Sequence, residues 1–257
     1  MTLRWVPGWN GLNEPEAVSY VAAVEAADGQ ELEFGVAKAI NDFVLGCKND
    51  GIWDAIKASC ILAGARTLNG ALVPLVGTAP TNYNFVSGDY NRETGLVGDG
   101  STKYLNSNRN NNSDPQNSKH LSVYVTAGSS GSGQAYIGVD GGSTGASGIF
   151  RSGFVRVHSG SGATVANAGV ASGLFGASLS VSSSFTARYN GVNESFSLSS
   201  QTPSNRLLTV FAMDNQGSMI SYSSDRLSFY SIGESLDLAL LDARVTNLIN
   251  AIGVAIP

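Results

Sequence analysis

The feature that most constrains this sequence is a succession of short apolar stretches ended by turn residues, which runs to about residue 232. It opens with Gly88–Leu105, GDYNRETGLVGDGSTKYL. Asp99 and Gly100 form a tight-turn dipeptide there, because glycine tolerates positive φ and aspartate can bond its own backbone. Apolar residues on both sides predict strand, turn, strand.

The same pattern recurs further along the chain. Residues 121–125 alternate apolar and polar side chains, and Asn190-Gly191 is the strongest hairpin signal in the sequence. Further strands are expected at residues 207–213 and 227–231. Residues 106–119, NSNRNNNSDPQNSK, lack any hydrophobic period and predict a long exposed loop. The fold class is therefore mainly β, an antiparallel sandwich.

Helical periodicity lies before and after these strands. Residues 16–27, 30–46 and 52–60 each repeat apolar residues at helical spacing, and Asp28 with Glu31 resembles a capping box for the second. Residues 235–252 predict an amphipathic helix that lies on the sheet. We expect three parts: an N-terminal arm at 1–15, an α-helical subdomain at 16–80, and the sandwich with its C-terminal helix at 81–257.

Composition limits the function classes. A net charge of −5 leaves no basic surface for a polyanion, so we expect no nucleic-acid partner. No run of 18 apolar residues and no secretory signal is evident, so neither a membrane span nor export is expected. Cys47 and Cys60 are expected to be buried thiols, not a disulfide or metal pair. Trp5 and Trp9 in the arm either fold back over the domain or insert into a neighbouring subunit.

Four stretches carry a family resemblance: GLVGDGSTKYL at 95–105, HLSVYVTA at 120–127, ARYNGVNES at 187–195 and DRLSFYSIGESLDLALLDARV at 225–245. Together they resemble a concanavalin A-like (laminin-G-like) jelly roll with a helix after its last strand. Two more stretches, DGIWDAIKASCILAGARTLNGALVPLVG at 50–77 and NFVSGDYNRETGLVGDGSTKYL at 84–105, resemble phage and marine viral proteins. The resemblance implies a fold and a phage or prophage structural setting, and it brings no catalytic motif.

No catalytic residue is assigned from the sequence. No predicted strand carries the closely spaced carboxylates of a glycoside hydrolase, and no Gly-x-Ser-x-Gly elbow is found. His120 and His158 lack partners at metal-ligand spacing. We therefore expect a protein that is not an enzyme and needs no cofactor.

Two binding sites are candidates. Calcium, as an optional cofactor, could bind Asp89 and Asp99, although turn aspartates are common for backbone reasons alone. A glycan could stack on tyrosine rings and bond to amides. The residues expected for that glycan site are Tyr83, Tyr90, Tyr104, Asn108 and Asn110. The alternative is that these tyrosines are half-buried sheet residues beside a solvated loop.

Together these observations predict a non-enzymatic phage virion structural protein, located in the virion and assembled in the cytoplasm of a bacterial host. The favoured interpretation is a tail-fibre, receptor-binding or other tail-associated component that presents a lectin-like sandwich. The first alternative is a capsid decoration protein, and the second is a free carbohydrate-binding protein or a glycan hydrolase. Expected partners are other virion proteins, a host surface glycan and further copies of the chain, with a trimer as the working hypothesis.

Overall fold

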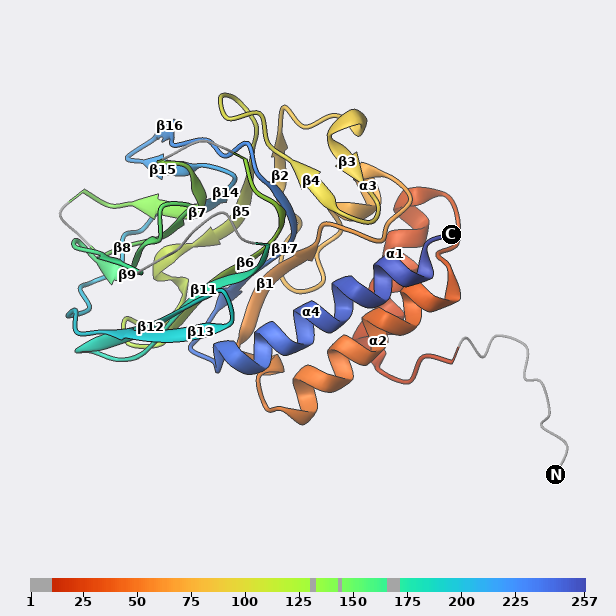
Figure 1. The fold of residues 1–257 in the computed structure, drawn as a ribbon, viewed down its shortest axis with the longest axis horizontal. Helices are drawn as coiled ribbons and strands as arrows, with labels where there is room; N and C mark the ends of the chain where they lie inside the picture. Colours follow the sequence, from red (N-terminus) through yellow and green to blue (C-terminus); the bar gives the residue numbers. More distant parts are fainter. Residues whose placement is uncertain (1–10, 130–132, 143–144, 166–171) are drawn as a thin grey trace, which may run out of the picture.

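The computed structural model describes residues 11–129, 133–142, 145–165 and 172–257 (Figure 1). Trp5 and Trp9 therefore lie outside the described residues. The helices are α1 (Pro15–Asp28), α2 (Phe34–Asn49), α3 (Leu68–Ala71) and α4 (Leu238–Ala255).

The strands form two sheets. Sheet A has the order β13-β12-β11-β6-β17-β4-β3, with β1 also paired to β17. Its strands are β1 (Ile56–Ile61), β3 (Tyr90–Asn91), β4 (Gly95–Val97), β6 (Lys119–Ala127), β11 (Gly173–Val181), β12 (Ser184–Tyr189), β13 (Val192–Phe196) and β17 (Arg226–Gly233).

Sheet B has the order β10-β9-β8-β7-β14-β5-β2, and the β15–β16 hairpin joins it at β7. Its strands are β2 (Thr81–Tyr83), β5 (Tyr104–Asn110), β7 (Ala135–Asp140), β8 (Ala146–Phe150), β9 (Phe154–Ser159), β10 (Ala163–Thr164), β14 (Leu207–Val210), β15 (Met213–Asn215) and β16 (Ser218–Ile220). Among the described strands the pairings are antiparallel apart from the parallel β7–β15 pair, and an isolated parallel bridge joins Gly145 to Pro203.

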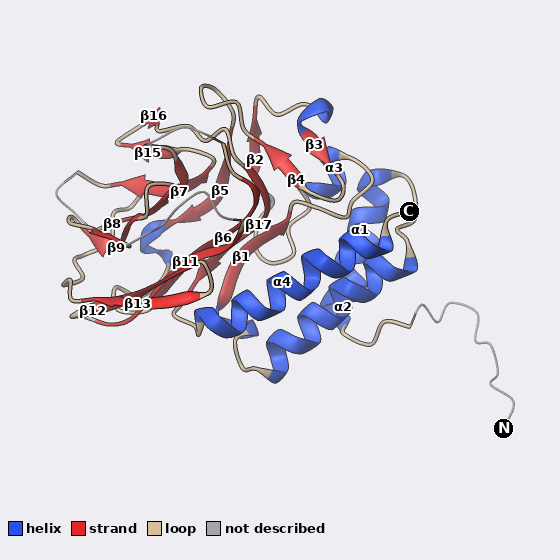
Figure 2. Ribbon diagram, in the orientation of Figure 1, coloured by secondary structure: helices blue, strands red, loops and turns tan. Residues whose placement is uncertain are grey.

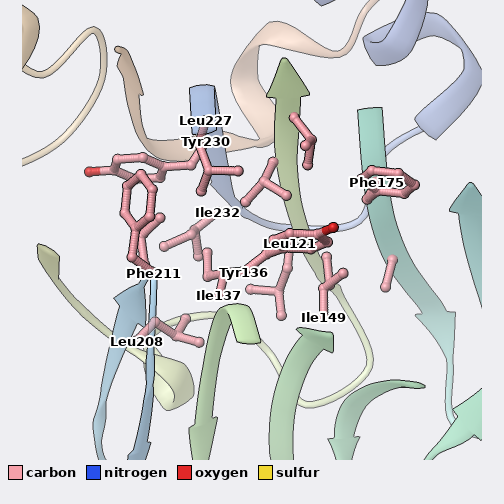
Figure 3. Packing of buried hydrophobic residues seen from close by; sticks show 14 of the residues in the cluster. Leu121, Tyr136, Ile137, Ile149, Phe175, Leu208, Phe211, Leu227, Tyr230 and Ile232 are labelled. Carbon is pink, nitrogen blue, oxygen red and sulfur yellow. The ribbon is translucent and has the colours of Figure 1, made fainter. Parts of the chain in front are cut away.

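A closely packed apolar core joins the two sheets (Figure 3). Leu121 and Tyr230 of sheet A and Ile137 of sheet B are each fully buried. The ring of Tyr136 stacks on Phe175 across the sandwich, with centroids 5.6 Å apart and planes at 12°. Burial of this apolar surface is the main force that holds the sheets together.

The long helices form a third layer on the outer face of sheet A, seen as blue ribbons in Figure 2. Phe43 of α2 meets Phe229 of β17 edge-on, with ring centroids 5.8 Å apart. At Gly176 a Cβ would lie 2.8 Å from Cδ2 of Leu238, so the first residue of α4 packs directly on the backbone of β11. Arg244 of α4 bonds both oxygens of Asp50, at 2.6 and 2.8 Å, which ties α4 to the end of α2.

These observations confirm the predicted fold class, an antiparallel β-sandwich with helices before it and a C-terminal helix. The hairpin at Asn190-Gly191 is also confirmed, because it joins β12 to β13 with positive φ at both residues. α4 confirms the helix expected at 235–252, shifted by three residues.

One of the described helices, α4, is long and apolar enough by length and composition to cross a membrane. Its apolar composition has a structural reason in this fold. Leu241, Val245 and Leu248 are buried in the cluster that α4 shares with α2 and sheet A.

The helix expected at residues 52–60 is wrong. A single 3-10 turn is followed there by β1, which pairs with β17 inside sheet A. Cys60 faces the core between the sheets and Ile61 faces the helices, so both sides of the strand are buried. A strand buried on both faces shows no polar alternation, which is why its sequence resembled a buried helix. The division of the chain into 1–15, 16–80 and 81–257 stays a prediction.

The capping box at Asp28 is also wrong. α2 begins at Phe34 with Glu33 at its N-cap position, whereas Asp28 is the last residue of α1. Its carboxylate instead accepts hydrogen bonds from the backbone of Arg66 at 2.6 Å and of Thr67 at 2.9 Å. Asp28 therefore fixes a distant loop instead of a helix end.

The strand, turn and strand predicted around Asp99-Gly100 are confirmed by β4 and β5. These two strands belong to different sheets, so the turn carries the chain across the sandwich. The loop expected next along the chain needs correction. Residues 106–119 are not an exposed loop, because β5 extends to Asn110 and the side chains of Asp114 and Lys119 are completely buried. Nζ of Lys119 lies 2.5 Å from Oδ2 of Asp114, so the two residues form a buried ion pair. The polar residues of this stretch are therefore partly buried and not simply solvated.

Candidate functional site

The outward face of β5 presents a tyrosine and amides. Leu105 and Ser107 are at most 1% exposed and point into the sandwich. Successive side chains of a strand alternate between faces, so Tyr104 and Asn106 point outward. The local sequence YLNS thus separates a core face from a polar surface face.

Two tyrosines form a fixed aromatic pair at this edge of sheet B. β2 runs antiparallel to β5 and places Tyr83 opposite Tyr104. Their rings stack with centroids 4.3 Å apart and planes at 6°, while Tyr222 meets Tyr104 edge-on at 6.3 Å. Tyr83 is 40% exposed, and because Tyr104 covers one face of its ring, that exposure belongs to the other face and the edges.

A groove begins beside this aromatic pair. Its volume is about 430 Å³. We call it the tyrosine groove, and its lining residues are Tyr104, Asn106, Asn110, Asn205, Arg206, Leu207, Thr209, Asp214 and Met219. Apolar surface and side-chain amides therefore share one hollow, which is the usual composition of a small-molecule site.

A charge pair closes one side of the groove. Arg206, just before β14, bonds Asp214 of β15 through two parallel contacts, Nε to Oδ2 at 2.9 Å and Nη2 to Oδ1 at 3.1 Å. Oδ1 of Asp214 also accepts from the amide of Gly217 at 2.6 Å. A bidentate pair of this kind holds both side chains in one geometry.

Tyr104 keeps its proton over the physiological range. Burial raises the pKa of its hydroxyl above the ordinary value, and the neighbouring Tyr83 and Tyr222 add to that effect. A neutral phenol can both donate and accept a hydrogen bond. Tyr104 is thus suited to contact a hydroxyl group.

The structure brings together three of the five predicted glycan residues. Tyr104 and Asn110 line the tyrosine groove, and Tyr83 stacks on Tyr104. Asn108 is turned away, because the register of β5 against β14 shifts at this point and Asn108 adopts a φ of 55°. Its side-chain amide donates to the carbonyl of Ala79 at 2.8 Å, which fastens β5 to the segment before β2.

Tyr90 lies elsewhere. It is on β3 at the edge of sheet A, and its hydroxyl donates to the carbonyl of Ala65 at 2.8 Å. Burial raises the pKa of this hydroxyl above its ordinary value. Tyr90 therefore stabilises the loop before α3 and does not join the other tyrosines.

The two predicted calcium ligands are engaged by protein donors. Asp89 accepts from the amide of Val86 at 2.8 Å and from Nζ of Lys103 at 2.6 Å. Oδ1 of Asp99 accepts from the amides of Ser101 and Thr102, at 2.9 and 2.8 Å. Among the residues that the structure describes, no group of three or more His, Cys, Asp or Glu side chains is arranged to hold a metal ion.

Sequence reasoning missed Arg206, Asp214 and Asn205. Asp214 had the appearance of an isolated turn residue, because its partner Arg206 lies eight positions away across β14. The available signal was the alternation along β14. Leu208 and Val210 are buried in the core, whereas Thr209 lies on the face of the strand that lines the groove. A sequence pattern could suggest that face but not which carboxylate lies beside it.

No protein-family model and no curated protein matches this sequence. Solved structures with a similar fold include the binding domain of botulinum neurotoxin serotype D, with a TM-score of 0.47, 12% identity, and coverage of 76% of this chain and 51% of that chain. The NanB sialidase of Streptococcus pneumoniae is similar with a TM-score of 0.39 and 12% identity over 51% of this chain and 24% of that one. A leech intramolecular trans-sialidase has a TM-score of 0.37 and 11% identity over 68% of this chain and 27% of that one. The chain thus spans about half or less of the length of each.

These neighbours correct one prediction. The sequence was expected to belong to a protein that is not an enzyme, yet sialidases are among the chains with a similar fold. The expectation rested on missing linear motifs, and residues that converge from separate strands leave no such motif. The prediction that the protein is not an enzyme is therefore withdrawn.

Proposed function

We propose that this protein is a lectin-like carbohydrate-binding protein and that the tyrosine groove is its binding site. The observation that carries the proposal is the stacked pair of Tyr83 and Tyr104 at the rim of a groove lined with amides. A sugar ring has an apolar face that packs on an aromatic ring, while its hydroxyls take hydrogen bonds from polar groups.

Within this proposal, Tyr104 supplies the aromatic surface, because it lines the groove. Asn106, Asn110 and Asn205 then offer amide donors and acceptors to the hydroxyls of the bound sugar. Tyr83 stacks on Tyr104 and holds it before any ligand arrives, so little side-chain entropy is lost on binding.

The test is a glycan array that includes bacterial surface polysaccharides, probed with the wild-type protein and Tyr104→Ala. We expect the wild type to bind and Tyr104→Ala to lose most of the signal, because Tyr104 lines the groove. Phe34→Ala is the control, because Phe34 is an exposed aromatic residue, at 64%, that lies at the start of α2. Binding that survives Tyr104→Ala unchanged, or no binding to any glycan, would overturn the proposal.

The biological setting that we propose is a phage virion, with the protein at the tail as a receptor-binding component. The support is the resemblance of residues 50–105 to phage and marine viral proteins, together with a site suited to a host surface glycan. Immunogold labelling of intact particles tests this setting. Gold at the tail is expected, whereas gold over the head would favour capsid decoration and unlabelled particles would contradict the virion setting.

A further inference from the structure

We infer that the tyrosine groove selects uncharged saccharides and discriminates against sugars that carry a carboxylate. This inference rests on the proposed function and specifies the ligand class of the same site. Its basis is the state of the charged groups that line the groove.

Arg206 is the arginine that lines the groove, and its positive charge is already paired with the carboxylate of Asp214. Two of its nitrogen atoms bond the two carboxylate oxygens of Asp214, at 2.9 and 3.1 Å. Recognition of a sugar carboxylate by arginine uses the same bidentate geometry. An acidic sugar would therefore have to displace Asp214 from Arg206 or accept a poorer contact.

Displacement of Asp214 is unfavourable. Its side chain is 9% exposed, and the carboxylate also accepts from the amide of Gly217 at 2.6 Å. A buried carboxylate that loses its cationic partner bears the full cost of desolvation. Asp214 also places a negative charge beside any ligand carboxylate, so the two would repel each other.

The remaining polar groups are neutral. Asn106, Asn110 and Asn205 carry amides, which donate and accept in the same way that sugar hydroxyls do. The hydroxyl of Thr209 is directed inward to the carbonyls of Gly138 and Ala212, so it does not serve the groove. The protein as a whole has a net charge of −5, which further disfavours anionic ligands.

The experiment compares neutral oligosaccharides with their uronic-acid counterparts, hexose for hexuronic acid at one position, by isothermal titration calorimetry. We expect the wild type to bind the neutral member at least about tenfold more tightly. Asp214→Asn preserves the shape of the side chain but leaves the charge of Arg206 unmatched, so we expect this ratio to fall by about tenfold or to reverse. Circular dichroism and the melting temperature of Asp214→Asn establish that the variant is folded.

Tighter binding of the uronic-acid member by the wild type would overturn the inference and leave the proposed function intact. This comparison uses the wild-type protein alone and does not depend on the folding of a variant. An unchanged ratio in folded Asp214→Asn would also overturn it, because the charge of Asp214 would then not set the selectivity. Failure of the wild type to bind any member would overturn the proposed function itself.

Discussion

Tyr83 and Tyr104 face each other across the β2–β5 pair with ring centroids 4.3 Å apart and an interplanar angle of 6°. β2 is the edge strand of sheet B and β14 lies on the other side of β5, so Tyr83 supports Tyr104 from the side away from the groove. Tyr104 itself lines the tyrosine groove. This arrangement connects the fold to the proposed function.

Asn110 and Asn108 provide a matched pair of variants on the same strand. Asn110 lines the tyrosine groove, whereas Asn108 bonds Ala79 on the side of β2. We expect Asn110→Ala to weaken glycan binding about three- to tenfold, the loss of one hydrogen bond of roughly 1 kcal/mol. Asn108→Ala should leave the dissociation constant unchanged within about twofold. Equal losses in both variants, measured by titration calorimetry, would contradict the placement of the site.

The Arg206–Asp214 pair predicts an energetic coupling. The two side chains are 33% and 9% exposed, so solvent screens this pair only in part. A double-mutant cycle with Arg206→Ala and Asp214→Ala should give a coupling of about 1–2 kcal/mol in the free energy of unfolding. Urea denaturation measures it. A coupling near zero would show that the groove wall is not held by this pair.

The sequence predicts local structure best where one residue type fulfils a single physical requirement. Asn190-Gly191 tolerates the positive φ of a two-residue turn, and the hairpin formed as expected. β1 was misassigned because both of its faces are buried, which removes the alternation that marks a strand. Asp99-Gly100 was identified as a turn, but which sheet each flanking strand joins depends on pairing with distant strands.

For the proposed site, the sequence predicted a tyrosine and amides of β5 but not their partners. Tyr104 and Asn110 were predicted because polar and aromatic residues cluster there, and both line the groove. Asn108 was predicted with them, but it has a left-handed backbone at a register shift and its amide bonds Ala79 instead of facing the groove. Arg206 and Asp214 could not be found, because long-range pairing between β14, β5 and β15 sets their positions.

Asp99 predicts a stability effect at the turn between the sheets. Burial opposes ionisation of its carboxyl, but the hydroxyl of Thr102 and the amides of Thr102 and Ser101 more than offset burial and lower the pKa. We expect Asp99→Ala to reduce the free energy of unfolding by about 1–2 kcal/mol, because these donors lose their acceptor. Asp54→Ala, an exposed aspartate in the turn before β1, is the control and should change it by less than about 0.5 kcal/mol. A similar loss in both variants would contradict this role of Asp99.

Asp114 predicts a dependence of stability on pH. Burial raises the pKa of its carboxyl, but Arg109 and Lys119 more than offset burial and hold the pKa below its ordinary value of 3.8. A carboxyl with a lowered folded-state pKa contributes stability above pH 3.8, and this contribution is lost as the pH falls toward the folded-state value. At pH 7, Asp114→Asn should cost about 3–5 kcal/mol, since Lys119 is left buried without its partner.

The difference between the wild type and Asp114→Asn should therefore shrink as the pH is lowered below 3.8, where Asp114 becomes protonated first in the unfolded chain and then, at lower pH, in the folded protein. Urea denaturation at pH 7, 5 and 3 measures the difference. A difference that stays constant over this range would contradict the assignment of a charged, ion-paired Asp114.

Calcium should have little effect on stability. The carboxylates of Asp89 and Asp99 are already bonded to Lys103 and to the amides of the turn, so a metal ion would have to replace these donors. We expect about 1 mM calcium, compared with a chelator, to shift the melting temperature by less than about 1 °C, since only a ligand that binds the folded state raises it. A rise of several degrees that disappears in Asp89→Asn would contradict this expectation.

The most direct test of the account is a crystal structure of the protein with a bound neutral oligosaccharide taken from the array. We predict a sugar in the tyrosine groove against the ring of Tyr104, with its hydroxyls bonded to Asn106 and Asn110 and with the Arg206–Asp214 pair intact. A sugar bound instead at another hollow of the surface, such as the one lined by Ser178, Asn193 and Asp237 beside the start of α4, would contradict the central claim.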